Sequence, residues 1–334
     1  MKRFAGLFFA VALVAALWSA GWFVVSAQVS TGLSDLALAE GSAERPRLSC
    51  ARSAVTGFPF RIDVTCEEAT VLAEDITVTL AGFKVSAQVD NPTHVLASAK
   101  GPITYTDAFY GSSNRLDFVN LQASARLTTA DLLKGLTGAG WRIARISVVG
   151  DGLDWVDTIG EDLPVAKASH AELQIGDIPE LHDKVAGTAA LAVYVVGRDV
   201  VAPIYNLVDA DGEAQLQLSG LPDDLRRFAE PDLLPAWQAA GGRLEIIRVN
   251  ATDGTDLIDA TGSLGLDASR RLEGQVTYSN RGIRERLAPF VNAMILSVMS
   301  GLPEADGTFK QAVQFANGAL LIGGIPLFQL EPLY

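Results

Sequence analysis

The dominant pattern along this chain is short-range alternation of apolar and polar residues. The runs 76–80, 83–89, 214–218 and 272–278 alternate with a period of two. Such alternation indicates strands with one buried and one wet face, which pair in antiparallel sheets rather than in a doubly wound parallel sheet. We therefore predict a mainly β (α+β) protein, in which an N-terminal transmembrane helix precedes an elongated, curved antiparallel β-sheet body with a few packed helices.

Helical patterns are fewer than strand patterns. Residues 128–136 fit a short capped helix, and 223–240 fits one or two short pieces broken by Pro231 and Pro235. The longest pattern covers 282–300, and we interpret it either as a helix docked on the sheet or as a movable cover over an apolar groove. The apolar side of this predicted helix, the putative groove cover, consists of Ile283, Leu287, Val291, Met294, Ile295 and Val298.

The N-terminal segment decides where the rest of the chain lies. Lys2 and Arg3 precede an uncharged run over residues 4–25, which at about 1.5 Å per helical residue reaches roughly 33 Å, enough to cross a bilayer core of about 30 Å. Because the basic residues precede the span, the N-terminus is expected in the cytoplasm and the body outside it. Residues 1–27 are thus predicted to be a signal anchor in the bacterial inner membrane. A signal peptide cleaved after Ala27 is the alternative.

The charge of the body excludes some partners. The whole chain carries a net charge of −13, and without Lys2 and Arg3 the remainder has 39 acidic and 24 basic residues, a net charge of −15. So acidic a body does not bind nucleic acid or anionic surfaces by bulk charge. The expected partners are the membrane, through residues 4–25, together with a lipid or other hydrophobic ligand and other envelope proteins.

The two cysteines of the chain flank a turn-rich centre. Cys50 and Cys66 lie on either side of the hairpin motif Gly57-Phe58-Pro59-Phe60, so a β-hairpin would bring them together. In an exported protein an even pair indicates a disulfide, and closing a loop of about 15 residues is worth on the order of 3 kcal/mol. A metal or redox pair is the alternative, which would favour closer spacing or histidine partners.

An internal similarity predicts a duplication. The segment 131–157, with helix, strand, Asp-Gly turn and strand signals, recurs as 232–259. Chance similarity between two hairpins is the alternative. We predict four regions: the anchor, a stalk and disulfide-hairpin region at 28–109, a first β module at 110–210, and a second β module at 211–334 that contains the helix 282–300 and the C-terminal strands.

The sequence indicates no catalytic, cofactor or metal site. The repeated Asp-Gly runs at 151–157 and 253–259 lack the closing carboxylate of a calcium loop and favour hairpin turns. His94, His170 and His182 are far apart in sequence and favour structural roles, although a zinc or nucleophile–histidine site could still assemble in space. Motifs of hydrolases, nucleotide-binding and dinucleotide-binding proteins are missing. We therefore expect a protein that is not an enzyme.

Two parts of the chain resemble a known family. Cys50, the run 56–61 (Thr-Gly-Phe-Pro-Phe-Arg) and Cys66 resemble domain-of-unknown-function family 2125, a group of bacterial envelope proteins, and so does the closing segment 317–334. The family has no assigned activity, so the resemblance implies an envelope location but no chemistry. More loosely, the anchor, the acidic β-rich body and the pattern at 262–267 resemble AsmA-like periplasmic proteins. That similarity would imply a curved sheet with an apolar groove and a part in outer-membrane lipid homeostasis.

These observations lead to three hypotheses. The first is a membrane-anchored periplasmic protein that binds a lipid or other hydrophobic ligand, or acts as a scaffold in cell-envelope homeostasis. The second is a purely structural interaction module without a ligand. The third is an envelope hydrolase with a site assembled from scattered residues. Small residues at 123, 125, 260 and 274 predict unfilled space on the sheet, as the first hypothesis requires.

Overall fold

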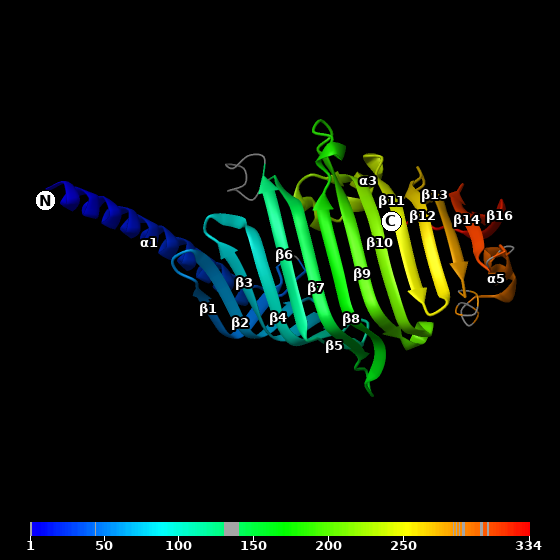
Figure 1. Ribbon diagram of the computed structural model, residues 1–334, viewed down its shortest axis with the longest axis horizontal. Helices are drawn as coiled ribbons and strands as arrows, with labels where there is room; N and C mark the ends of the chain where they lie inside the picture. The colour runs from blue at the N-terminus through cyan, green and yellow to red at the C-terminus, as the bar shows by residue number, and fades with distance from the viewer. Residues whose placement is uncertain are drawn as a thin grey trace. The chain divides into compact units, whose positions relative to one another are not determined.

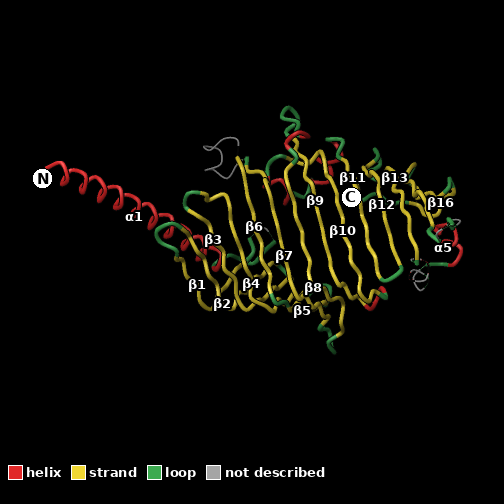
Figure 2. The backbone as a smooth tube through the Cα atoms, viewed as in Figure 1, coloured by secondary structure: helices red, strands yellow, loops and turns green. Residues whose placement is uncertain are grey.

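The computed structural model describes residues 2–43, 45–129, 140–282, 284, 286, 288, 291–300, 303–305 and 307–334. The chain forms two compact units. Unit 1 comprises Met1–Ser124 with Asp154–Leu163, and unit 2 comprises Ala125–Leu153 with Pro164–Tyr334. Most of the described chain is strand (Figure 2).

Unit 1 contains the N-terminal helix α1 (Lys2–Ala37) and an antiparallel sheet in which β1 through β5 are neighbours in chain order. The order is β1-β2-β3-β4-β5, β6 also pairs with β4, and the end of β7 pairs with β5. The connections from β1 through β5 are short turns, as expected for a meander. The strands are β1 (Arg47–Thr56), β2 (Arg61–Ala73), β3 (Ile76–Gln88), β4 (Asn91–Asp107), β5 (Ser112–Asp117), β6 (Asn120–Thr129) and β7 (Trp141–Asp157).

Helix α1 is long and apolar enough to cross a membrane over Gly6–Ala37, by length and composition. Its N-terminal turns extend away from the strands, and its C-terminal turns lie beside β1 (Figure 1). Its hydroxyl groups bond to the backbone of the preceding turn: Ser19 Oγ donates to the Ala15 carbonyl at 2.8 Å, and Ser30 Oγ donates to the Ser26 carbonyl at 2.9 Å. Helix α1 ends at Ala37, so it continues into the beginning of the predicted stalk and disulfide-hairpin region at 28–109.

Unit 2 also contains a meander, with β8 through β16 paired in chain order. Two short α-helices pack on its strands: α3 (Leu233–Ala239) on β10 and α5 (Ala293–Ser300) on β14. The strands are β8 (Leu163–Asp177), β9 (Thr188–Ala202), β10 (Leu207–Pro222), β11 (Arg243–Asp253), β12 (Asp256–Leu266), β13 (Leu272–Arg281), β14 (Phe309–Ala316), β15 (Ala319–Ile322) and β16 (Ile325–Gln329). Three 3-10 turns connect them: η1 (Pro179–Leu181), η2 (Pro203–Tyr205) and η3 (Leu225–Ala229).

The predicted fold class is confirmed: a mainly β chain with a long antiparallel sheet, one apolar N-terminal helix and few others. The alternating runs lie in strands apart from Val89, and the two runs within 76–88 form one strand, β3. The break predicted at Pro231 is confirmed, because this residue lies between η3 and α3, whereas the break predicted at Pro235 is wrong. Pro235 falls in the first turn of α3, where its missing N–H costs no intrahelical bond.

The single helix predicted over 282–300 is wrong. Val291 and Asn292 lie outside helix, and α5 begins only at Ala293. The reason is in the sequence, because a proline at position 289 clashes with the carbonyl four residues earlier in a continuous helix. Ile283 and Leu287, two of the putative groove-cover residues, lie outside the described residues, as does most of the helix predicted at 128–136. Thr128 and Thr129, its predicted first residues, end β6.

The two Asp-Gly runs adopt different structures. Gly254 forms the turn between β11 and β12, where Asp253 pairs with Asp256, as predicted. The turn predicted at Gly152 is wrong, because this residue lies inside the 17-residue strand β7. Both glycines have positive φ, a geometry that serves a tight turn or an irregularity within a strand. The matching local sequences therefore do not produce matching hairpins, and the duplication itself stays a prediction.

The side chains of Asp224 and Trp237 stabilise the part of unit 2 around η3 and α3. Asp224 accepts hydrogen bonds from the Gly140 amide at 3.0 Å and from the Arg226 guanidinium at 2.6 Å. The hydrogen bonds from Arg226 lower the pKa of Asp224 strongly, although its partial burial opposes this. Trp237 of α3 donates to the Ser219 carbonyl at 2.8 Å and covers Gly242, where a Cβ would lie 2.2 Å from the indole nitrogen.

Candidate functional site

The predicted disulfide hairpin is present in unit 1. Strands β1 and β2 pair antiparallel, and Cys50 and Cys66 are bonded with their Cα atoms 5.5 Å apart. Cys66 is almost fully buried. Because both sulfurs are in this bond, they are not free to ligate a metal, and the bridge fixes the hairpin whose tip carries residues 57–60.

The tip of this hairpin is a tight turn with its carbonyl groups bonded. Gly57 has φ +105°, and a Cβ there would lie 2.7 Å from the Arg61 carbonyl oxygen, so the turn needs glycine. The Arg61 amide donates to the Gly57 carbonyl, and the Val89 amide of the β3–β4 turn donates to the Phe60 carbonyl, both at 3.0 Å. The Pro59 and Arg61 carbonyls accept hydrogen bonds from outside the sheet.

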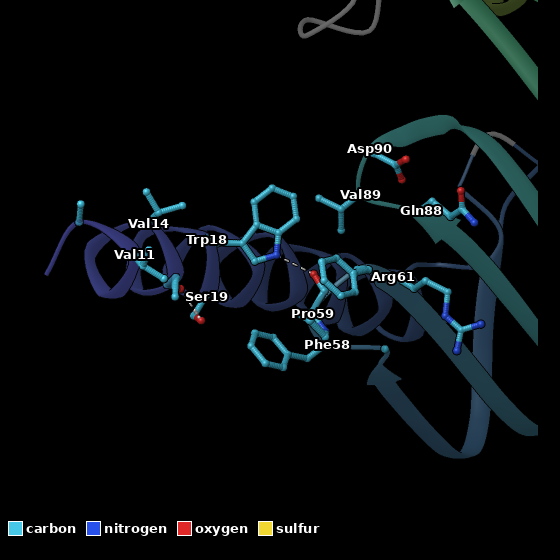
Figure 3. A pocket seen from close by; sticks show the side chains of 14 residues that line it. Val11, Val14, Trp18, Ser19, Phe58, Pro59, Arg61, Gln88, Val89 and Asp90 are labelled. Carbon is cyan, nitrogen blue, oxygen red and sulfur yellow. Dashed lines mark hydrogen bonds between the residues drawn. The ribbon is translucent and has the colours of Figure 1, made fainter. Parts of the chain in front are cut away.

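The carbonyls of Pro59 and Arg61 accept hydrogen bonds from two indole N–H groups of α1. Trp18 Nε1 donates to the Pro59 carbonyl at 2.9 Å, and Trp22 Nε1 donates to the Arg61 carbonyl at 2.8 Å. The two donors are four residues apart and so lie on one face of the helix. The hydrogen bonds therefore fix both the height and the rotation of α1 against the hairpin tip (Figure 3).

Aromatic rings complete this junction, which we call the aromatic collar and define as Trp18, Trp22, Phe23, Phe58 and Phe60. Phe58 packs edge-on to Trp22 with ring centroids 5.4 Å apart and stacks on Phe23 at 5.8 Å. Phe60 lies against Trp18 at 6.4 Å. Ring pairs at these separations each add about 0.5–1.5 kcal/mol beyond their buried area. Trp22 is buried, whereas Phe58 and Phe60 stay 50% and 68% exposed.

A groove of 1220 Å³ opens between α1 and the tips of two hairpins. Figure 3 shows Val11 and Val14 along the helix and Val89 of the β3–β4 turn on the other side of Trp18. The hydroxyl of Ser19 is bonded to the helix backbone, so it leaves no unpaired donor in the groove. The lining residues are Ala10, Val11, Val14, Ala15, Trp18, Ser19, Gly57, Phe58, Pro59, Phe60, Arg61, Gln88, Val89 and Asp90.

A second groove of 610 Å³ shares Val14, Trp18, Gln88 and Val89 with the first. It is also apolar, and the sheet contributes residues from the ends of β2 and β3. Its other lining residues are Leu17, Gly21, Trp22, Val25, Ile62, Ala87 and Pro92. The second half of the apolar run 4–25 in α1 is therefore flanked by two adjoining grooves and is not packed tightly against the sheet.

The charges at the rim are partly neutralised. Asp63 is buried and lies 3.0 Å from Lys84 Nζ and 3.5 Å from an Arg61 guanidinium nitrogen. Burial raises the pKa of Asp63, but hydrogen bonds from Ser86 and Lys84 and the charges of both cations outweigh it, so the pKa lies below its usual value. Together the three charged groups carry one net positive charge beside the groove, and Asp90 lines the groove as a carboxylate.

The small residue Gly274 lines a groove of a different kind, in unit 2. This groove of 710 Å³ carries charged and amide side chains, including Arg243, Glu245 and Glu273, and not the apolar lining that the sequence predicts there. The described residues of 283–298 are not among those that line it. In the described part of that segment, α5 packs on β14, and Gln311 Nε2 donates to the Val298 carbonyl at 3.0 Å. The role of groove cover stays a prediction.

Each histidine has a hydrogen-bond partner in its own unit. His94 bonds to Ser124 at 3.0 Å, His170 bonds to Asp151 at 2.8 Å, and His182 bonds to Asp177 at 2.6 Å. Within the described residues, histidine, cysteine, aspartate and glutamate form no group of three or more that could hold a metal ion. The histidines therefore do not assemble with one another.

Sequence reasoning found the hairpin motif but missed its partner. The two tryptophans predict a membrane interface, yet nothing in their spacing shows that they bond to a turn some 40 residues later. The β3–β4 turn was likewise missed as a groove wall, because Gln88, Val89 and Asp90 carry no motif.

The family comparison covers the hairpin and most of the C-terminal segment, the two parts of the chain that carry the predicted resemblance. The model of DUF2125, described as an uncharacterized protein conserved in bacteria, matches residues 22–331. The comparisons with curated proteins and with solved structures found no match. The match begins within the aromatic collar and contains the whole sheet of both units. The chain therefore belongs to the DUF2125 family of bacterial proteins.

Proposed function

We propose that this protein is a single-pass inner-membrane protein that binds a membrane lipid beside its own anchor, with its body in the periplasm. Three observations support the placement. Helix α1 is long enough to span a bilayer, Lys2 and Arg3 precede it, and the disulfide suits an oxidising compartment.

The observation that carries the function is the groove beside α1. Its volume of 1220 Å³ exceeds the range of about 300–1,000 Å³ common for small-molecule sites, which suits a long acyl chain. One wall is the part of the helix from Ala10 to Ser19, which lies within the proposed span. A lipid tail in the bilayer could enter the groove sideways, without passing through water.

The energetics favour exchange over permanent capture. A lipid tail leaving the bilayer for an apolar groove exchanges one apolar environment for another, so the hydrophobic term nearly cancels. The same tail would lose about 0.8 kcal/mol per CH₂ on entering water. Binding then depends on the head group, and Arg61 at the rim offers a cation for a lipid phosphate.

The test is lipid occupancy of the full-length protein extracted in mild detergent and analysed by native mass spectrometry. Val89→Asp places a carboxylate in both grooves, and Val119→Asp makes the same change at an exposed site that lines neither. We expect bound phospholipid with the wild type and Val119→Asp, and its loss with Val89→Asp. Equal occupancy in all three proteins would refute the proposed site.

The scaffold, the ligand-free module and the hydrolase stay predictions, and no described feature favours one of them. An empty groove in the wild-type protein would return the scaffold to first place. The looser similarity to AsmA-like proteins is likewise a prediction.

A further inference from the structure

The hairpin tip 57–60 presents apolar surface at the end of unit 1 that lies beside the anchor. The turn carries no charged residue, and its two phenylalanines are half to two-thirds exposed although other rings are close by. Large apolar side chains exposed together mark contact surfaces. The question is which surface they contact.

The position of the tip along α1 answers this. The tip bonds to Trp18 and Trp22, whereas the uncharged run continues to Val25. Trp18 precedes Val25 by seven residues, which is about 10 Å along the helix at about 1.5 Å per residue. If residues 4–25 fill the hydrocarbon core, the tip lies below its outer boundary.

The hydrogen bonds of the tip suit that position. A carbonyl without a partner costs several kcal/mol in hydrocarbon, because no water can bond to it. Four of the five carbonyls in residues 57–61, all but that of Phe58, accept protein hydrogen bonds, two of them from the indoles of the anchor. Pro59 brings no N–H that would need an acceptor. Arg61 follows directly, with a side chain long enough to keep its charge at the interface.

We infer that the hairpin tip 57–60 inserts into the outer half of the bilayer as a second membrane element next to α1. The partner is the lipid bilayer itself. The inference rests on the proposed span of α1, but it does not require a lipid in the groove. Insertion at two places would hold β1–β4 at a fixed tilt to the membrane, which a single helix cannot do.

The experiment uses the full-length protein in nanodiscs with a fluorophore on single introduced cysteines, since both native cysteines are in the disulfide. The labels replace Phe60 at the tip, Val11 in the span and Phe109 in the β4–β5 turn. Phe109 is a matched control, because it is also an exposed aromatic residue but lies at the opposite ends of the same strands. Quenching is measured with phospholipids that carry a spin label on the acyl chain.

We expect strong quenching at positions 11 and 60, and quenching several-fold weaker at 109. Quenching at 11 without quenching at 60 would overturn the insertion and leave the span intact. Weak quenching at all three positions would overturn the span, and the insertion with it. A fourth label at Asn91, the exposed first residue of β4 next to the β3–β4 turn, should be quenched by head-group spin labels, and quenching no stronger than at 109 would also contradict the tilt.

Discussion

The strongest quantitative prediction concerns the disulfide of the hairpin. Cys50→Ala opens the bridge but keeps the buried sulfur of Cys66, so the change removes the cross-link with little loss of core packing. The two cysteines are 16 residues apart. In the chain-entropy model a loop of this size restrains the unfolded chain by about 3 kcal/mol at 25 °C.

This loss should appear where the hairpin opens. Each 1.4 kcal/mol changes an equilibrium constant about tenfold, so about 3 kcal/mol raises the opening equilibrium of β1 and β2 on the order of 100-fold. Amide hydrogen exchange reports this equilibrium strand by strand. The amides of β1 and β2 should exchange about 100-fold faster in Cys50→Ala than in the wild type, whereas those of β12 and β13 in unit 2 should keep their rates and serve as the internal control.

A matched substitution separates the cross-link from the side chain. Ser49→Ala changes the exposed neighbour of Cys50 on the same strand and should leave exchange in β1 and β2 within about twofold, as surface substitutions do. If Cys50→Ala behaved like Ser49→Ala, the bridge would not limit opening of the hairpin. The reasoning from loop entropy would then be wrong for this protein.

Three further predictions test local geometry. Gly57→Ala should accelerate exchange in β1 and β2 more than Gly111→Ala, since both incur about 1–2 kcal/mol of left-handed strain but only the former also meets a carbonyl oxygen at 2.7 Å. The pKa of Asp224 is lowered in the folded state, so its contribution to stability is complete above its unfolded pKa of about 3.9 and is lost as the pH falls through the folded value. The urea midpoint should therefore fall less below pH 4 in Asp224→Asn than in the wild type. Gly242→Ala should displace the Trp237 indole and red-shift its fluorescence, at a cost of about 1–3 kcal/mol, and an unchanged spectrum would contradict the stacking.

Local patterns were reliable where neighbours along the chain decide the structure. The alternation in 272–278 predicts β13 because a strand in a meander pairs with strands close in sequence. The cysteines were predicted to bond for the same reason, since one hairpin contains both. Where a choice depended on distant partners, the patterns failed: Asp253-Gly254 forms a turn, but Asp151-Gly152 lies inside β7, whose end pairs with β5.

The sequence alone determined the class of the fold, the apolar helix and the disulfide hairpin, because each follows from spacing within a short stretch of chain. Only the tertiary structure decided how the hairpin meets the helix. The bonds from Trp18 to Pro59 and from Trp22 to Arg61 join segments about 40 residues apart, and the groove that they border is lined by residues of both segments. Indole N–H groups and turn carbonyls are common in any sequence. They become a site only when folding places them at hydrogen-bond distance, and spacing along the chain carries no record of that.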